Sequence, residues 1–136
     1  MTRIESESTA IKQSAETIFN FLSDFSNIGK LMPSQVVNFE TDGATCKFTI
    51  QGMATLGMAY KSKTPNSSVV MTKHEKAPFD FDLICEIKEM NASESLLQLI
   101  FDADLNPFLK MMAEKPLKNF LNLLVTKYKN IAEGAA

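Results

Sequence analysis

Between residues 36 and 102 the apolar side chains alternate with polar ones, and this pattern constrains the fold more than any other feature. The clearest run places Phe79, Phe81, Leu83, Cys85 and Ile87 on one side, with mostly charged residues between them. Alternation with a period of two predicts a strand that has one face in the core and the other in water. Weaker runs predict five further strands, at residues 36–40, 46–51, 56–61, 68–76 and 97–102.

The segments between these strands are short and rich in turn residues. Thr41-Asp42-Gly43, Thr64-Pro65-Asn66-Ser67 and Asn91-Ala92-Ser93 are the clearest of them. Short turns join neighbouring strands as hairpins, so the sheet is expected to be antiparallel. A sheet with one apolar face needs another element to cover that face.

The first 35 residues predict a strand followed by two short helices. Residues 2–11 form an opening strand that is polar enough to lie at an edge. Ser14 is typical of a helix N-cap, and the apolar residues after it recur at helical spacing. The helices are expected at 14–24 and 26–32, with Pro33 ending the second.

The C-terminal segment predicts the long helix that covers the sheet. Asn106-Pro107 is a helix start, because proline at the first position loses no hydrogen bond. Pro116 lies inside the pattern and predicts a kink or a split. Residues 132–136 are expected to be frayed. An apolar stripe faces the sheet, made by Leu117, Phe120, Leu121, Leu124, Tyr128 and Ile131.

The fold class that follows is α+β, with a curved antiparallel sheet of about seven strands around a long C-terminal helix. This order of elements resembles the START-related, Bet v 1-like superfamily, which is also called polyketide cyclase-like. The resemblance rests on residues 14–24, on Leu31-Met32-Pro33 and on the helix from Pro107 to Ile131 with its break at Lys115-Pro116-Leu117. It implies the helix-grip fold with a cavity between sheet and helix. It implies no single reaction, because members include lipid carriers, hormone receptors, cyclases and hydratases.

Composition excludes several classes of function. A chain of 136 residues with 45% hydrophobic and 22% charged residues predicts one globular domain over 1–136. A net charge of −2 and a single arginine, Arg3, argue against a nucleic-acid partner. No apolar run reaches about 18 residues, and the opening lacks a signal-peptide pattern. A cytoplasmic protein without integral membrane association is therefore expected.

The reactive side chains give no catalytic or metal motif. His74 is the only histidine. It lies on the strand predicted at 68–76, and the pattern does not show which face of that strand is apolar. Cys46 and Cys85 share the core face of their strands, where thiols are usually inert. Asp102 and Asp104 are expected to face water and to make local hydrogen bonds. We therefore predict no catalytic residue, no metal and no cofactor.

The candidate ligand site is the concave side of the sheet together with the helix that faces it. A small apolar or amphipathic molecule, neutral or weakly polar, is the expected partner. Two alternatives stay open: a cyclase or hydratase enzyme using polar groups in the same cavity, and a filled domain that serves in protein association. A homodimer is also left open. The predicted lining residues are Phe48, Ile50, Met58, Tyr60, Phe81, Leu83, Leu99, Phe101, Met112 and Phe120.

Overall fold

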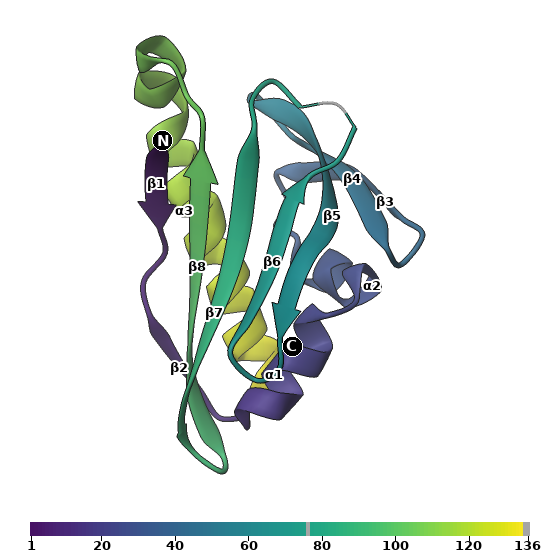
Figure 1. Ribbon diagram of the computed structural model, residues 1–136, viewed down its shortest axis with the longest axis vertical. Coiled ribbons are helices and arrows are strands. Elements are labelled where there is room, and N and C mark those ends of the chain that lie inside the picture. Colours follow the sequence, from purple (N-terminus) through teal and green to yellow (C-terminus); the bar gives the residue numbers. More distant parts are fainter. Residues whose placement is uncertain (76, 135–136) are drawn as a thin grey trace.

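The computed structural model describes residues 1–75 and 77–134, and across them eight strands form one antiparallel sheet (Figure 1). The strand order is β1-β8-β7-β6-β5-β4-β3, and β2 also pairs with β8. Consecutive strands from β3 to β8 are neighbours in this order, as expected for hairpins. The strands are β1 (Thr2–Glu5), β2 (Thr9–Ile11), β3 (Val36–Thr41), β4 (Thr45–Ile50), β5 (Ala54–Thr64), β6 (Ser68–Lys73), β7 (Phe81–Asn91) and β8 (Glu94–Ala103).

The helices begin at the capping residues that the sequence indicates. Ser14 accepts a hydrogen bond from the Thr17 N–H at 3.1 Å, and Asn106 accepts one from the Leu109 N–H at 2.8 Å. None of the described helices is long and apolar enough to cross a bilayer. The helices are α1 (Ala15–Leu22), α2 (Phe25–Ile28), the 3₁₀ helix η1 (Gly29–Leu31) and α3 (Pro107–Ala132).

The sheet curves around α3, which lies behind it in Figure 1, with α1 near the lower end and α2 on the right at mid-height. Apolar residues of β4 to β8 alternate in burial, and their buried side chains share one core cluster with those of α3. Phe48 of β4 and Phe120 of α3 stack with ring centroids 6.1 Å apart. The predicted α+β helix-grip architecture is thereby confirmed. The buried face of α3 consists of Ala113, Leu117, Phe120, Leu121, Leu124, Val125 and Tyr128.

The opening strand predicted at 2–11 is in fact two strands that pair with the same partner. Between them lies Ser6, a buried polar residue. The Ser6 backbone N–H donates to the Leu99 carbonyl, and the Leu99 N–H donates to Ser6 Oγ, both at 2.9 Å. The serine hydroxyl therefore replaces a backbone acceptor where the ladder is interrupted, which a period-two pattern cannot reveal.

Of the kink or split predicted at Pro116, the split does not occur. The helix α3 runs through Pro116 as one element. This proline is exposed, and on that side a carbonyl that has lost its helical N–H can be solvated. The apolar stripe ends earlier than predicted, because Ile131 is 39% exposed. Of the tail expected to fray, Ala132 closes the helix, while residues 135 and 136 lie outside the described residues.

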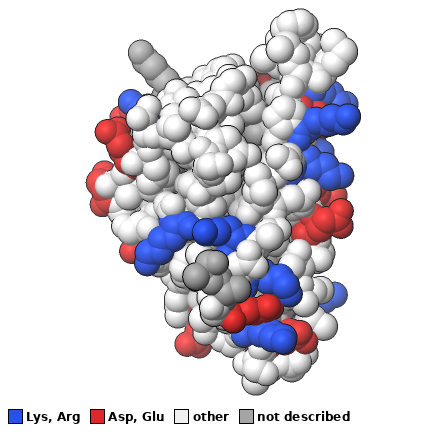
Figure 2. Space-filling model, turned by 180° about the vertical axis from the view of Figure 1, so that it is seen from behind, with Lys and Arg blue, Asp and Glu red and all other residues white. Residues whose placement is uncertain are grey.

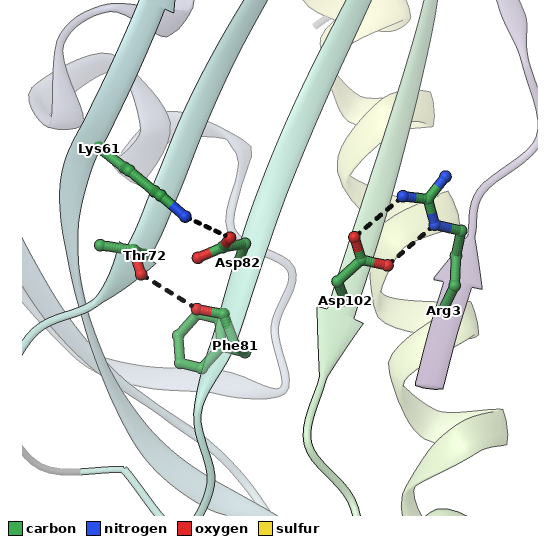
Figure 3. A network of polar contacts seen from close by, with 6 residues as sticks. All are labelled: Arg3, Lys61, Thr72, Phe81, Asp82 and Asp102. Carbon is green, nitrogen blue, oxygen red and sulfur yellow. Dashed lines mark hydrogen bonds and ion pairs between the residues drawn. The ribbon is translucent and has the colours of Figure 1, made fainter. Parts of the chain in front are cut away.

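The outer face of the sheet carries a row of paired charges (Figure 3). Asp82 and Asp102 are directly opposite each other on β7 and β8, an arrangement that is unfavourable for two bare carboxylates. Arg3 of β1 holds Asp102 with two bonds of 2.9 and 3.0 Å, and Lys61 of β5 holds Asp82 at 2.9 Å. Asp102 was thus correctly predicted to face away from the core, but its partner is 99 residues away rather than local.

Candidate functional site

The candidate site is the space enclosed by the concave face of the sheet, α3 and the short helices. Its volume is about 20 Å³, which is room for a single water molecule. In the conformation described, the side chains therefore fill the cavity that the resemblance implies.

Six of the ten predicted residues line this space. They come from β4, β5, β7, β8 and α3, as the alternation of each strand indicated, and all are buried. These residues are Phe48, Met58, Leu83, Leu99, Phe101 and Phe120.

Three further predicted residues are packed elsewhere. Ile50 is buried but does not border the space. Phe81 stacks on Phe101 with centroids 4.9 Å apart. Tyr60 stacks on Phe25 at 4.2 Å, and its hydroxyl donates to the Leu22 carbonyl at 2.6 Å. Both rings pack on another aromatic ring, and neither borders the enclosed space.

The placement of Met112 at the site was wrong. This side chain is 60% exposed and lies on the face of α3 that points away from the sheet. Its neighbour Ala113 is the residue that packs inward, at 5% exposure. The first turns of α3 carry apolar residues on both faces, so the sequence could not tell which of them faced the sheet.

The sequence pattern missed the contribution of the short helices and of β6. Met71 is fully buried and lines the space. The inner face of the strand predicted at 68–76, which the sequence left undecided, is therefore the one that carries Met71. Leu124 and Tyr128 were predicted to pack on the sheet, and they also reach the space. The other lining residues are Leu22, Ile28, Leu31, Met32, Leu56, Cys85 and Leu97.

The polar groups near the site are already satisfied or chemically quiet. The Tyr128 hydroxyl donates to Gln13 Oε1 at 2.7 Å, and burial raises the pKa of Tyr128 above its ordinary value. Burial also raises the pKa of the Cys85 thiol to about 12. Cys46 behaves likewise, with its pKa raised by burial to about 12 despite a backbone hydrogen bond. Thiols with such high pKa values are poor nucleophiles at neutral pH.

His74 lies outside the enclosed space. Its backbone N–H donates to the Gly57 carbonyl at 2.9 Å, and its side chain is 42% exposed, with Nε2 at 3.7 Å from Glu75 Oε1. The His74 carbonyl covers Gly57 so closely that a Cβ there would clash with it. This segment borders an open surface groove of about 1270 Å³.

The groove has mixed charge. Its lining includes the acids Glu40, Asp42 and Glu75 and the bases Lys47 and Lys73. Within residues 1–75 and 77–134, His, Cys, Asp and Glu side chains nowhere gather in threes as metal ligands would. Neither sign of charge dominates the groove, so it indicates no particular ion or ligand.

Comparison with known proteins identifies the architecture. A START superfamily protein from Mycobacterium smegmatis superposes with a TM-score of 0.74 at 19% identity, over 98% of this chain and 99% of that one. The chain has the START-like, Bet v 1-like fold. The protein XoxI from Bacillus cereus superposes with a TM-score of 0.77 at 13% identity, over 98% and 96% of the two chains.

A third structural neighbour is a protein solved as the Aha1 dimer from Colwellia psychrerythraea. It superposes with a TM-score of 0.68 at 15% identity, over 99% of this chain and 98% of that one. No family model matches the sequence, and no curated protein matches it. At these identities the likeness establishes the START-like fold alone.

Proposed function

We propose that the chain binds a small, neutral, apolar molecule between the concave sheet and α3. The observation that supports this is the character of the lining. Apart from the hydroxyl of Tyr128, which is already hydrogen-bonded, and the neutral thiol of Cys85, every lining side chain is purely apolar or a methionine. Such a surface favours aliphatic or aromatic ligands and offers no charge to hold a phosphate or a carboxylate.

Binding requires the interior to expand. Sites for small molecules usually measure roughly 300–1,000 Å³, far more than the enclosed space of about 20 Å³. Three of the lining side chains are methionines, Met32, Met58 and Met71. Their unbranched side chains can change rotamer at little cost, which gives the interior a means of adapting.

The segment that moves is proposed to be α2 with η1. These seven residues pair with no strand, and Ile28 and Leu31 cover one side of the space. Gly29 packs so closely on Phe39 that a Cβ at Gly29 would lie 2.8 Å from Phe39 Cε1. A short helix held mainly by side-chain packing opens more readily than a strand inside the sheet.

The direct test is binding of N-phenyl-1-naphthylamine, a neutral probe that fluoresces in apolar surroundings. The parent chain is expected to bind it, Leu99→Ala to bind it more tightly because the cavity is enlarged, and Met58→Trp to lose it. Met90→Ala is the matched control, because Met90 is 54% exposed on the β7–β8 hairpin. Circular dichroism verifies that each variant is folded.

If neither the parent nor the folded Leu99→Ala variant takes up the probe, the binding proposal fails. Native mass spectrometry of the purified chain adds an independent readout, because a retained ligand appears as a discrete mass increment.

A variant with Gly29→Ala should bind the probe faster, since the added methyl pushes η1 away from Phe39.

Protein association is the second candidate function. The observation in its favour is the nearly filled interior, which leaves the domain's surfaces as its means of recognition. Analytical ultracentrifugation tests self-association, including a homodimer, and the probe experiment distinguishes the two candidates.

A cyclase or hydratase activity finds no support in the lining, because the polar groups of the lining are already bonded or neutral. A cytoplasmic, reducing location is part of the proposal and agrees with the two free cysteines.

A further inference from the structure

The first two turns of α3 expose large apolar side chains. Phe108 is 64% exposed, Met111 78% and Met112 60%. Phe108 and its two methionine neighbours stand three and four positions apart, so they form one stripe on the helix surface. We call these three residues the apolar tip.

The apolar tip has no role in packing the core. Leu109 and Ala113 in these turns, and Leu117 in the next, point inward, and they lie on the opposite side of α3. A helix needs one apolar face to pack on a sheet, and a second one exposes apolar surface to water at a cost. The second face therefore indicates a partner outside the fold.

The tip projects from the body of the protein. In Figure 1 the start of α3 rises beyond the end of the sheet, above β1. In Figure 2 the same region forms a white knob at the upper right, with blue basic side chains and some red acidic atoms below it. A convex projection suits insertion into a soft surface better than docking on a flat protein face.

Lysines lie directly behind the apolar tip along the helix. Lys115 is seven residues after Phe108 and Lys118 seven after Met111, so both continue the outward face, roughly 10 Å further along the axis. Between residues 107 and 118 there are three lysines and one acid, Glu114, a net charge of +2 in a chain whose total is −2. Apolar side chains followed by cations match the order of acyl chains and anionic headgroups in a bilayer.

We propose that this end of α3 docks on the surface of an anionic lipid bilayer, with the apolar tip inserted and Lys115 and Lys118 at the headgroups. A second copy of the chain is the less suitable occupant. The three side chains at 60–78% exposure offer on the order of 400 Å², whereas a stable protein interface takes about 800 Å² from each partner. The proposal concerns the outer surface of α3 and does not depend on a ligand inside the fold.

Vesicle flotation tests this docking with lipid alone as the probe. The parent chain should float with vesicles of phosphatidylcholine and phosphatidylserine, and much less with phosphatidylcholine alone. Combining Phe108→Ser, Met111→Gln and Met112→Gln should weaken partitioning by more than about 100-fold, because three apolar insertions are lost. Met90→Gln is the control, since Met90 is an exposed methionine on the distant β7–β8 hairpin.

The charges are tested separately. Replacing both lysines, Lys115→Gln with Lys118→Gln, should weaken binding to the anionic vesicles by about 25-fold, at about fivefold for each cation. It should change binding to phosphatidylcholine little. Lys127→Gln is the matched control, because Lys127 is exposed on the far part of the same helix.

Insertion itself can be observed with a single tryptophan, because the chain contains none. Phe108→Trp should show a blue shift with anionic vesicles and quenching by brominated acyl chains, whereas Met90→Trp should show neither. Two results would overturn the proposal. One is equal flotation of the parent and the tip variant, and the other is a dimer in sedimentation that the tip substitutions dissociate while no variant binds vesicles.

Discussion

The two parts of α3 carry the same kind of apolar pattern and end in opposite environments. From Leu117 to Tyr128 most apolar side chains are buried, whereas Phe108, Met111 and Met112 face water. Apolar spacing thus shows that a helix has an apolar face, but the extent of the neighbouring sheet decides whether that face is covered.

The position of the sheet's end explains this difference. The last strand, β8, ends at Ala103, and α3 begins four residues later at Pro107. Because this connection is short, the first turns of α3 lie past the ends of the strands, and the rest of the helix runs along the sheet, as Figure 1 shows. Only the inward residues of these turns, such as Ala113, reach the core.

The largest expected effect distinguishes the two parts of the helix by stability. Phe120→Ala should lower the free energy of unfolding by about 3–5 kcal/mol, because Phe120 is 4% exposed and its loss leaves a cavity. Phe108→Ala, the same substitution in the exposed part, should change stability by less than about 0.5 kcal/mol. Urea denaturation measures both, and similar values for the two variants would contradict the contrast.

The next effect tests whether the two parts behave as one helix. Pro116 stands between them and has no N–H to donate within α3. Pro116→Ala should stabilise the protein, by up to about 3 kcal/mol, because alanine restores the missing bond and the helix propensity. An unchanged thermal midpoint would mean that the first turns fold independently of the rest. Lys115→Ala is the control for a neighbouring exposed site.

A third prediction concerns the apolar interior beneath the buried part of α3. The folded state raises the pKa of Cys46 and of Cys85 from 9.0 to about 12 by burial, so it favours the neutral thiols. The stabilising contribution is complete below pH 9 and is lost as pH rises toward 12. Between pH 9 and 10 stability should fall by up to about 1.4 kcal/mol per pH unit for each thiol.

The cysteines themselves provide the control for this slope. A variant with Cys46→Val and Cys85→Val should show a flatter dependence between pH 9 and 10, before tyrosines in the unfolded chain titrate strongly. Equal slopes for parent and variant would show that water already reaches both thiols in the folded state.

The smallest effect concerns the polar end of the buried part. Tyr128 is 2% exposed, and its hydroxyl donates to Gln13 Oε1. Tyr128→Phe should cost about 1 kcal/mol, because it removes the bond and leaves the glutamine oxygen without this donor. Changing the partner instead, Gln13→Ala, should cost a similar amount, and the double variant should not add the two losses.

Much of the candidate site followed from strand alternation. The side chains of Phe48, Met58, Leu83, Leu99 and Phe101 lie where a period of two placed them, because every residue of one parity on a strand shares a face. Met71 escaped because residues 68–76 give no clear alternation. Tyr60 has the correct parity, yet it is engaged by Phe25 of α2, a contact between segments 35 residues apart that no local pattern contains.

The sequence by itself determined the order and type of the elements, the caps of the helices and the apolar face of most strands. These depend on interactions between residues close in the chain, whose spacing is visible in the sequence. Only the tertiary structure decided that Ser6 interrupts the first strand, that Asp102 pairs with Arg3, that the interior is nearly full and that Met112 faces water. Each of these depends on how distant segments pack together, and packing is set by the shapes of both partners at once.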